Sequence, residues 1–321
     1  MKIIEIGKNE ENQRLDKFLF RCFNDAPKSF IYKMLRKKRI KLNSGKAEGS
    51  EMLGEGDKIL MRLSEETMGG FMSEREIAPA KKGFGVIYED ENILIVQKPA
   101  GLLCHPGAEG DRDTLIDQIL FYLASKGDFD PSSQGFFTPA LANRLDRNTS
   151  GIVLCGKNLP ALQDMNRAIA EKKVEKLYLA LVLGKVLRPG VLKGLYVKDG
   201  SKNKAFAVSD EGAKEVCLSY RPLKNSENYS LLEVNLITGR SHQIRLQLKE
   251  AGHPIAGDRK YGDPAANSFF REEYGISNQF LHAESVKWLS DEGPLSYLYG
   301  RKFEALLPAK LREAEKNLFD R

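Results

Sequence analysis

Hydrophobic and polar positions in the first sixty residues alternate in patterns typical of short helices and strands. Leu15 begins a run of hydrophobic residues at positions i, i+3, i+4 and i+7, which predicts one buried face of a helix over residues 14–22. A second helix is expected from about Ser29, a favourable N-cap residue. Residues 39–43 and 56–63 have the alternation of half-buried strands. Residues 1–63 therefore predict a small α/β module.

Residues 64–84 have neither periodicity and contain a Gly-Gly pair and a proline, so they are expected to be a linker. Beyond them, residues 85–321 read as a larger α+β domain with a mixed, mainly antiparallel sheet flanked by helices, because hairpins join most of its strands. A polar loop over residues 124–138 could overhang a site. The predicted elements are a hairpin over 85–98, strands at 151–157 and 176–186 with a helix at 159–174 between them, a hairpin over 214–223 and 229–237, a helix from about 241 that ends before Gly252, a strand at 280–289 and a helix at 308–319.

Charge is distributed unevenly along the chain. Of its 50 Lys+Arg and 44 Asp+Glu, residues 1–64 hold 15 and 9, so the remaining residues carry 35 of each sign. Residues 28–46 contain eight basic residues and no acidic one, which indicates a polyanionic partner. The candidate RNA-binding residues there are Lys33, Arg36, Lys37, Lys38, Arg39 and Lys41.

Several classes of protein do not fit the sequence. The longest apolar run, residues 178–183, is too short to cross a bilayer, and the first residues lack the pattern of a signal peptide, so a cytoplasmic location and no membrane partner are expected. The four cysteines form no Cys-x-x-Cys pair and are expected to be reduced structural thiols. No metal-ligand spacing, phosphate-binding glycine loop or Gly-x-Ser-x-Gly motif is present, so no metal or other cofactor is predicted.

Three polar residues beside predicted strand and helix ends are candidates for chemistry. Asp146 lies between two arginines in "NRLDRNTSGI", a pattern that is also common in surface ion pairs. Arg245 shares a helix with Ile244 and Leu248, and a partly buried arginine there needs an anion from the protein or from a substrate. Tyr178 is expected on the opposite face of its strand from its leucine neighbours.

Taken together, five ordered blocks resemble the RluA/RluC/RluD-type pseudouridine synthases of large-subunit ribosomal RNA. They are "NILIVQKPAGLLCHPG", "NRLDRNTSGIVLCGKN", "EKLYLALVLG", "LITGRSHQIRLQLKEAGHPIAGDRKYGD" and "QFLHA", and the front module resembles the S4 RNA-binding domain. The match covers nearly the whole chain. Many members carry His at the position of Asn143 and Asp at that of Asn148, which affects the subfamily rather than the activity.

The resemblance implies an isomerase that converts uridines to pseudouridine, most often in 23S ribosomal RNA and less often in transfer RNA, without a cofactor. The catalytic positions it implies are Asp146, Tyr178 and Arg245, and the substrate-binding positions are Arg144, Arg240 and His242. An ionised Asp146 would act on the ribose as nucleophile or as base towards the C2′ proton, and these two roles stay open. Arg245 would keep Asp146 ionised and oriented, and Tyr178 would offer an aromatic face to the detached uracil.

Two other functions compete with this prediction. A non-catalytic RNA-binding or ribosome-assembly protein could share the fold, although a decayed site would tolerate substitutions at Asp146, Tyr178 and Arg245. An N-glycosidase would release the base to water, but such enzymes usually use two carboxylates and the signature block offers one. The protein is expected to act as a monomer.

Overall fold

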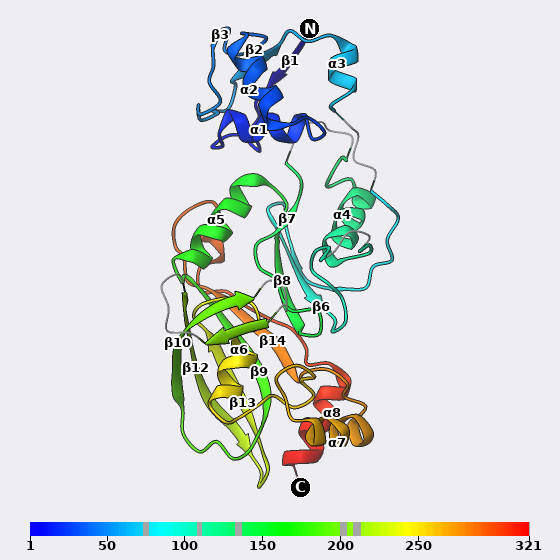
Figure 1. Cartoon of the computed structure of the whole chain (residues 1–321), viewed down its shortest axis with the longest axis vertical. Helices are drawn as coiled ribbons and strands as arrows, with labels where there is room; N and C mark the ends of the chain where they lie inside the picture. Colours follow the sequence, from blue (N-terminus) through cyan, green and yellow to red (C-terminus); the bar gives the residue numbers. More distant parts are fainter. Residues whose placement is uncertain (73–76, 108–110, 132–136, 200–203, 208–212, 321) are drawn as a thin grey trace.

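The computed structural model describes residues 1–72, 77–107, 111–131, 137–199, 204–207 and 213–320 (Figure 1). Two separate sheets organise the chain: a four-stranded sheet of order β1-β4-β2-β3 near the N-terminus and an eleven-stranded sheet in the rest. The N-terminal elements are β1 (Lys2–Glu5), α1 (Leu15–Cys22), α2 (Lys28–Arg36), β2 (Ile40–Leu42), β3 (Gly45–Lys46), β4 (Lys58–Met61) and α3 (Glu65–Gly69).

The N-terminal module forms as its hydrophobic pattern predicts. Leu15, Phe18 and Leu19 of α1 are fully buried against α2 and the small sheet. Helix α2 begins at Lys28, one residue before the expected N-cap, because Pro27 already has an N-cap backbone conformation. Met72 is buried in the same hydrophobic cluster, so the start of the 64–84 segment packs on this module.

The larger sheet has the strand order β11-β10-β12-β13-β9-β14-β8-β6-β5, with β15 paired to β14 and β7 to β8. Among the strand pairs of the described ranges, only β8–β14 is parallel, so the predicted mixed, mainly antiparallel α+β architecture is confirmed. Its elements are β5 (Gly85–Glu89), β6 (Ile93–Lys98), α4 (Leu115–Lys126), β7 (Ala140–Leu141), β8 (Ser150–Gly156), α5 (Leu159–Ala170), β9 (Val174–Leu183), β10 (Gly190–Asp199), β11 (Lys204–Ala207), β12 (Lys214–Asn225), β13 (Tyr229–Leu236), α6 (Gln243–Glu250), α7 (Pro264–Tyr274), β14 (Leu281–Trp288), η1 (Ser296–Leu298), β15 (Lys302–Glu304) and α8 (Ala309–Phe319).

Some element boundaries differ from the prediction. Helix α5 ends at Ala170 rather than near 174, because Lys172 adopts a left-handed conformation with a φ of 61° and the chain turns directly into β9. Helix α6 begins at Gln243, two residues after the predicted start, because His242 is also left-handed (φ 58°). Helix α4, absent from the prediction, takes in the first residues of the expected 124–138 loop, and residues 132–136 of that loop lie outside the described ranges.

The parallel contact between β8 and β14 depends on a glycine. Gly151 has a φ of 118° and pairs with Ala283, and a Cβ at this position would collide with the Ala283 carbonyl oxygen. Only glycine combines this conformation with so close an approach of two backbones. The sheet therefore requires a glycine at position 151.

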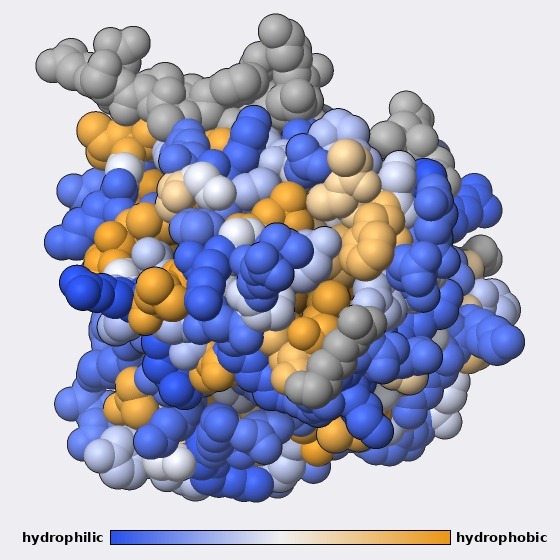
Figure 2. Space-filling view, turned by 90° about the horizontal axis from the view of Figure 1, so that it is seen from below, coloured by the Kyte–Doolittle hydropathy of each residue, from blue (hydrophilic) through white to orange (hydrophobic). Residues whose placement is uncertain are grey.

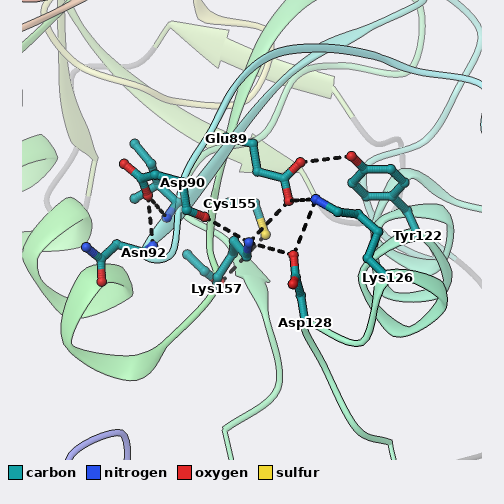
Figure 3. A network of polar contacts seen from close by, with 10 residues as sticks. Glu89, Asp90, Asn92, Tyr122, Lys126, Asp128, Cys155 and Lys157 are labelled. Atoms are coloured by element: carbon teal, nitrogen blue, oxygen red, sulfur yellow. Dashed lines mark hydrogen bonds and ion pairs between the residues drawn. The ribbon is translucent and has the colours of Figure 1, made fainter.

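A polar network holds α4 to the end of β8 that lies away from Asp146 (Figure 3). The Lys157 ammonium contacts Glu89 at 3.1 Å and Asp128 at 2.8 Å, and Lys126 contacts Glu89 at 2.7 Å. The Tyr122 hydroxyl donates to the second oxygen of Glu89 at 2.8 Å. These contacts join β5, α4 and the residue after β8, although the segments are far apart in sequence.

Among the described residues, no helix is both long and apolar enough to cross a bilayer. The face seen in Figure 2 carries hydrophobic residues in separate groups among hydrophilic ones. The four cysteines are free thiols, and three of them are buried.

Candidate active site

Asp146 lies in the turn between β7 and β8. The Thr149 backbone N–H donates to the Asp146 carbonyl at 3.0 Å, which closes the turn, while Leu145 is buried in the core below it. The Asp146 side chain keeps 24% of its surface exposed. The carboxylate is thus held at the edge of the core and remains accessible to a ligand.

A buried lysine ties this turn to the loop after β6. Lys98 is fully buried, and its ammonium donates to the carbonyl oxygens of Pro99, Leu102 and Arg147 at 2.9, 2.8 and 3.0 Å. The Gly101 N–H also donates to the Arg147 carbonyl at 2.8 Å. Burial lowers the pKa of Lys98 to about 8, from an ordinary value of 10.5. The segment "QKPAG" therefore positions the loop that carries Asp146.

Arg245 pairs with Asp146, as the family resemblance implied, and also with a second carboxylate. Its Nη1 donates to Asp146 Oδ2 at 2.9 Å, and its Nε and Nη2 donate to the two oxygens of Asp258 at 2.7 and 2.8 Å. Burial alone would lower the pKa of Arg245, but the hydrogen bonds and charge of Asp258, together with the charge of Asp146, raise it. Arg245 is thus a permanent cation whose direction two carboxylates define.

Asp258 and Tyr261 were not recognised from the sequence. Asp258 is fully buried and also accepts the backbone N–H groups of Lys260 and Tyr261 at 2.9 and 3.1 Å. The Tyr261 ring lies 5.1 Å from the Arg245 guanidinium carbon. The one signal for them was that "AGDRKYG" lies within the longest family-like block.

Tyr178 shares a cavity with Asp146. The strand alternation places Tyr178 on the same face as Ala180 and Val182, whereas Leu181 packs in a cluster on the other face, as predicted. The cavity has a volume of about 110 Å³. Burial raises the pKa of the Tyr178 phenol, so it stays neutral at physiological pH. Its hydroxyl has no hydrogen-bond partner within the described ranges and is available to a ligand.

The three predicted substrate-binding residues lie around the same cavity. Arg144 and Arg240 are exposed on its wall, and neither side chain has a polar partner among the residues that the structure describes. His242 is half-buried, and its Nδ1 contacts the Tyr261 hydroxyl at 2.9 Å. Burial lowers the pKa of His242, which favours the neutral imidazole. The wall of this cavity therefore carries the positive charge of two exposed guanidinium groups.

The turn that presents Arg240 and His242 is held by Gln243. Its side-chain oxygen accepts hydrogen bonds from the Thr238 hydroxyl at 2.9 Å and the Arg240 N–H at 3.1 Å. Its side-chain nitrogen donates to the Cys217 carbonyl at 3.1 Å, on the neighbouring strand β12. The segment "TGRSHQ" is therefore anchored to the sheet.

The two asparagines that differ from many family members have different environments. The Asn143 side chain accepts the Leu154 N–H at 2.8 Å and so supports β8. Asn148 lines the neighbouring cavity of about 300 Å³, together with Asp146 and Arg245. The Asn143 side chain therefore supports β8, whereas Asn148 lines the cavity of about 300 Å³ beside Asp146.

The basic residues predicted to bind RNA lie on the N-terminal module, apart from Asp146. Lys33, Arg36 and Lys37 are exposed on α2 or at its end, Lys38 and Arg39 follow that helix, and Lys41 on β2 is half-buried. Figure 1 shows α2 in the upper module and α6 in the lower one. No cluster of three or more potential metal ligands occurs among the residues that the structure describes.

Comparison with known proteins assigns the class to which this fold and site belong. The family model for RNA pseudouridylate synthase matches residues 92–250. The structure of human RNA pseudouridylate synthase domain containing 4 superimposes with a TM-score of 0.56 at 20% identity, covering 73% of this chain and 92% of that one, which shows the shared fold. With curated relatives 32% and 37% identical over 90% and 85% of the chain, these matches show that the chain is a member of the RNA pseudouridine synthase family, and an isomerase.

Curated relatives give the branch within that family. A ribosomal large subunit pseudouridine synthase C from Rickettsia bellii is 37% identical over 285 residues, 85% of this chain and 88% of the relative. The corresponding protein of Vibrio parahaemolyticus is 32% identical over 90% of this chain and 88% of its own length. A ribosomal large subunit pseudouridine synthase D from Borreliella burgdorferi is 32% identical over 80% and 78%. The chain is of the RluC/RluD type.

Proposed function

We propose that this protein converts specific uridines of large-subunit ribosomal RNA to pseudouridine, with Asp146 as the catalytic carboxylate. The ion pair between Asp146 and Arg245, at 2.9 Å on the wall of the Tyr178 cavity, is the observation that carries the proposal. It combines an accessible carboxylate, a buried cation and an aromatic ring in one place. The substrate class follows the printed names of the C- and D-type relatives.

The proposed chemistry breaks the bond between ribose C1′ and uracil N1 and joins C1′ to C5. The C5–H bond breaks with loss of its proton to solvent, and N1 takes up a proton, so the product is an isomer of uridine. Positive charge develops on the ribose as the N-glycosidic bond breaks, as it does in glycoside cleavage. Asp146 acts either as a nucleophile at the sugar or as the base for the C2′ proton. Both roles place the Asp146 carboxylate against the sugar, where Arg245 Nη1 holds Oδ2 by a hydrogen bond of 2.9 Å.

The detached uracil must turn before it rejoins the ribose. The Tyr178 ring offers a face that holds the base without selecting one orientation of its hydrogen-bonding edge. Tyr178 remains neutral, so its hydroxyl serves as a hydrogen-bond partner during the turn. Before this step the target nucleotide leaves its stack, and the free guanidinium groups of Arg144 and Arg240 are placed to hold the RNA backbone around it.

The burial and pairing of the second carboxylate, Asp258, argue against a glycosidase. Asp258 is fully buried and both of its oxygens accept hydrogen bonds from Arg245. It is therefore unable to activate water at a sugar in the way the second carboxylate of a glycosidase does. One accessible carboxylate fits an isomerase.

RNA carrying tritium at C5 of uracil tests the proposal. Isomerisation releases the label to water and leaves the RNA mass otherwise unchanged. A glycosidase would leave abasic sites, and a non-catalytic assembly protein would produce neither change. Absence of tritium release from precursor large-subunit RNA, and from the same RNA in an assembling particle, would refute the proposed activity.

Variants at Asp146 test the assigned role. Asp146→Asn and Asp146→Ala are expected to abolish tritium release, because neither has a carboxylate, while RNA affinity stays close to that of the natural protein. Asp291→Asn, an exposed carboxylate outside the site, is the matched control and should retain activity. Turnover by Asp146→Ala would remove Asp146 from its role.

A further inference from the structure

A larger cavity lies next to the cavity of about 300 Å³ that Asp146 lines, and we call it the second cavity. It has a volume of about 650 Å³ and lies between the loop after β6, the start of β8, residues 275–279 and the beginning of α8. It shares Asn148 and Gln279 with the cavity of about 300 Å³ beside Asp146. These two cavities therefore share part of one wall.

The walls of this second cavity combine apolar surface with a few free polar groups. The apolar part comes from Pro99, Ala100, Ile276, Pro308 and Leu311. Gln279 is fixed by its hydrogen bond to the Thr149 hydroxyl at 3.1 Å. In contrast, the side chains of Asn148, Asn278 and Lys310 have no polar partner within the described ranges. A mainly apolar pocket with a few free hydrogen-bonding groups is the usual composition of a small-molecule or base-binding site.

The charge of the second cavity favours an anionic occupant. No Asp or Glu occurs among the described residues that line it, whereas Lys310 stands at its edge and is exposed. The amides of Asn148 and Asn278 can each donate and accept, as the edge of a nucleobase requires. The apolar residues can bury part of the surface that a base exposes to water when it leaves its neighbours.

We infer that the second cavity binds the base of a nucleotide close to the target uridine in the same RNA strand. Asn148 and Asn278 contact the edge of this base, and Lys310 contacts a phosphate beside it. This inference rests on the proposed function, because an everted uridine at Asp146 places its sequence neighbours at the shared wall. The second cavity would then make the enzyme sensitive to the identity of one flanking nucleotide, which is a determinant of site choice.

An abasic scan combined with a variant at the wall of the second cavity tests this inference. Each nucleotide near the target is replaced in turn by an abasic residue, and kcat/KM for tritium release is measured. With the natural protein, the abasic replacement at one flanking position should lower kcat/KM about tenfold, because the second cavity then loses its contacts with the base. Ala309→Trp, which places a bulky side chain at the wall of the second cavity, should show that loss with intact RNA and no further loss with the abasic RNA.

Ala265→Trp is the matched control, because Ala265 also follows a proline in the first turn of an exposed helix but lines none of the cavities described here. It should behave like the natural protein. Asn278→Leu, which preserves the size of the side chain, should reduce the preference for one base at the same position. If Ala309→Trp and the natural protein respond alike at every flanking position, the second cavity does not bind a base.

Failure of the base-site inference can be distinguished from failure of the proposed isomerase activity. Tritium release from intact RNA by the natural protein tests the isomerase activity alone. If no RNA releases the label, the affinity of the protein for each abasic RNA is measured instead. A loss of affinity at one position that Ala309→Trp removes would still support the base site, and a flat profile would overturn it.

Discussion

At the scale of single residues, the position of Arg245 is defined mainly by Asp258. Asp258 receives two of the three hydrogen bonds that Arg245 donates to carboxylates, and Asp146 receives one. Burial would raise the pKa of Asp258, but the Arg245 hydrogen bonds and the two backbone N–H groups lower it, so it stays ionised. Arg245 is thus preorganised before any substrate arrives, and Asp146 meets a cation that is already in place.

Asp258→Asn is expected to lower the single-turnover rate of tritium release by on the order of 10²-fold while RNA affinity changes little. The amide keeps the size of the side chain but loses the charge that orients Arg245. The measurement compares the rate with saturating enzyme against the dissociation constant for RNA, and Asp291→Asn serves as the control. A rate within about twofold of the natural one would show that Asp146 alone positions Arg245.

Lys98 gives a prediction about pH. The pKa of Lys98 is lowered to about 8 in the fold, from an ordinary 10.5, so between these values the unfolded chain binds more protons than the folded one. Stability must then rise with pH across this window, on the order of 3 kcal/mol in total for this residue. Denaturant unfolding from pH 7 to 10 should show the natural protein gaining stability relative to Lys98→Met as pH rises. A constant difference between the two proteins would contradict the lowered pKa.

At the scale of elements, β8 connects the loop that carries Asp146 to the rest of the domain. Asp146 precedes it, Gly151 allows its close parallel contact with β14, and Lys157 follows it. The Lys157 side chain is only 8% exposed and bridges Glu89 and Asp128 (Figure 3). Each end of the strand is therefore held by contacts with segments distant in sequence.

Lys157→Met is expected to lower the free energy of unfolding by roughly 2–3 kcal/mol, because Glu89 and Asp128 would keep their charges without this largely buried partner. Lys126 still contacts Glu89 and limits the loss. Chemical denaturation measures the effect. Lys193→Met, at an exposed position on β10, is the control and should change stability by less than about 0.5 kcal/mol. An equally small effect at Lys157 would mean that the network contributes little.

At the scale of the whole molecule, the basic residues of α2 and the cavity that Asp146 lines belong to different modules. Residues 1–64 carry the entire net charge of +6, and the remaining residues balance to zero. Exposed lysines and arginines on α2 suit contacts with phosphates, which provide affinity without sequence information. The N-terminal module is therefore expected to supply much of the RNA affinity, and the larger domain to supply the chemistry.

Replacing Arg36 and Lys37 by glutamine should weaken RNA binding and reduce its dependence on salt. For every phosphate that the variant no longer neutralises, the slope of log affinity against log salt is expected to fall by about 0.7–0.9. Binding isotherms at several salt concentrations measure the slope, and Lys193→Gln controls for the removal of a positive charge. The rate at saturating RNA should remain unchanged. An unaltered slope in the double variant would show that these two residues do not bind phosphate.

Local sequence patterns determined much of this protein. The spacing of Leu15, Phe18 and Leu19 predicted α1, and alternation around Tyr178 predicted which side of its strand it would occupy, because such periodicities depend on neighbouring residues only. Ordered family-like blocks pointed to Asp146 and Arg245. The left-handed Lys172 that ends α5 was not predictable, because no glycine marks it.

Only the tertiary structure decided which groups surround those residues. Asp258 is 13 positions from Arg245, and nothing in its local sequence distinguishes it from other acids that could pair with an arginine. The acceptors of Lys98 are backbone carbonyls, which every residue possesses, so no side-chain pattern could predict them. The cavity between the β6 loop and α8 likewise exists only because segments some 200 residues apart meet in the fold, through contacts such as that between Gln97 and the Leu306 carbonyl, 209 residues apart.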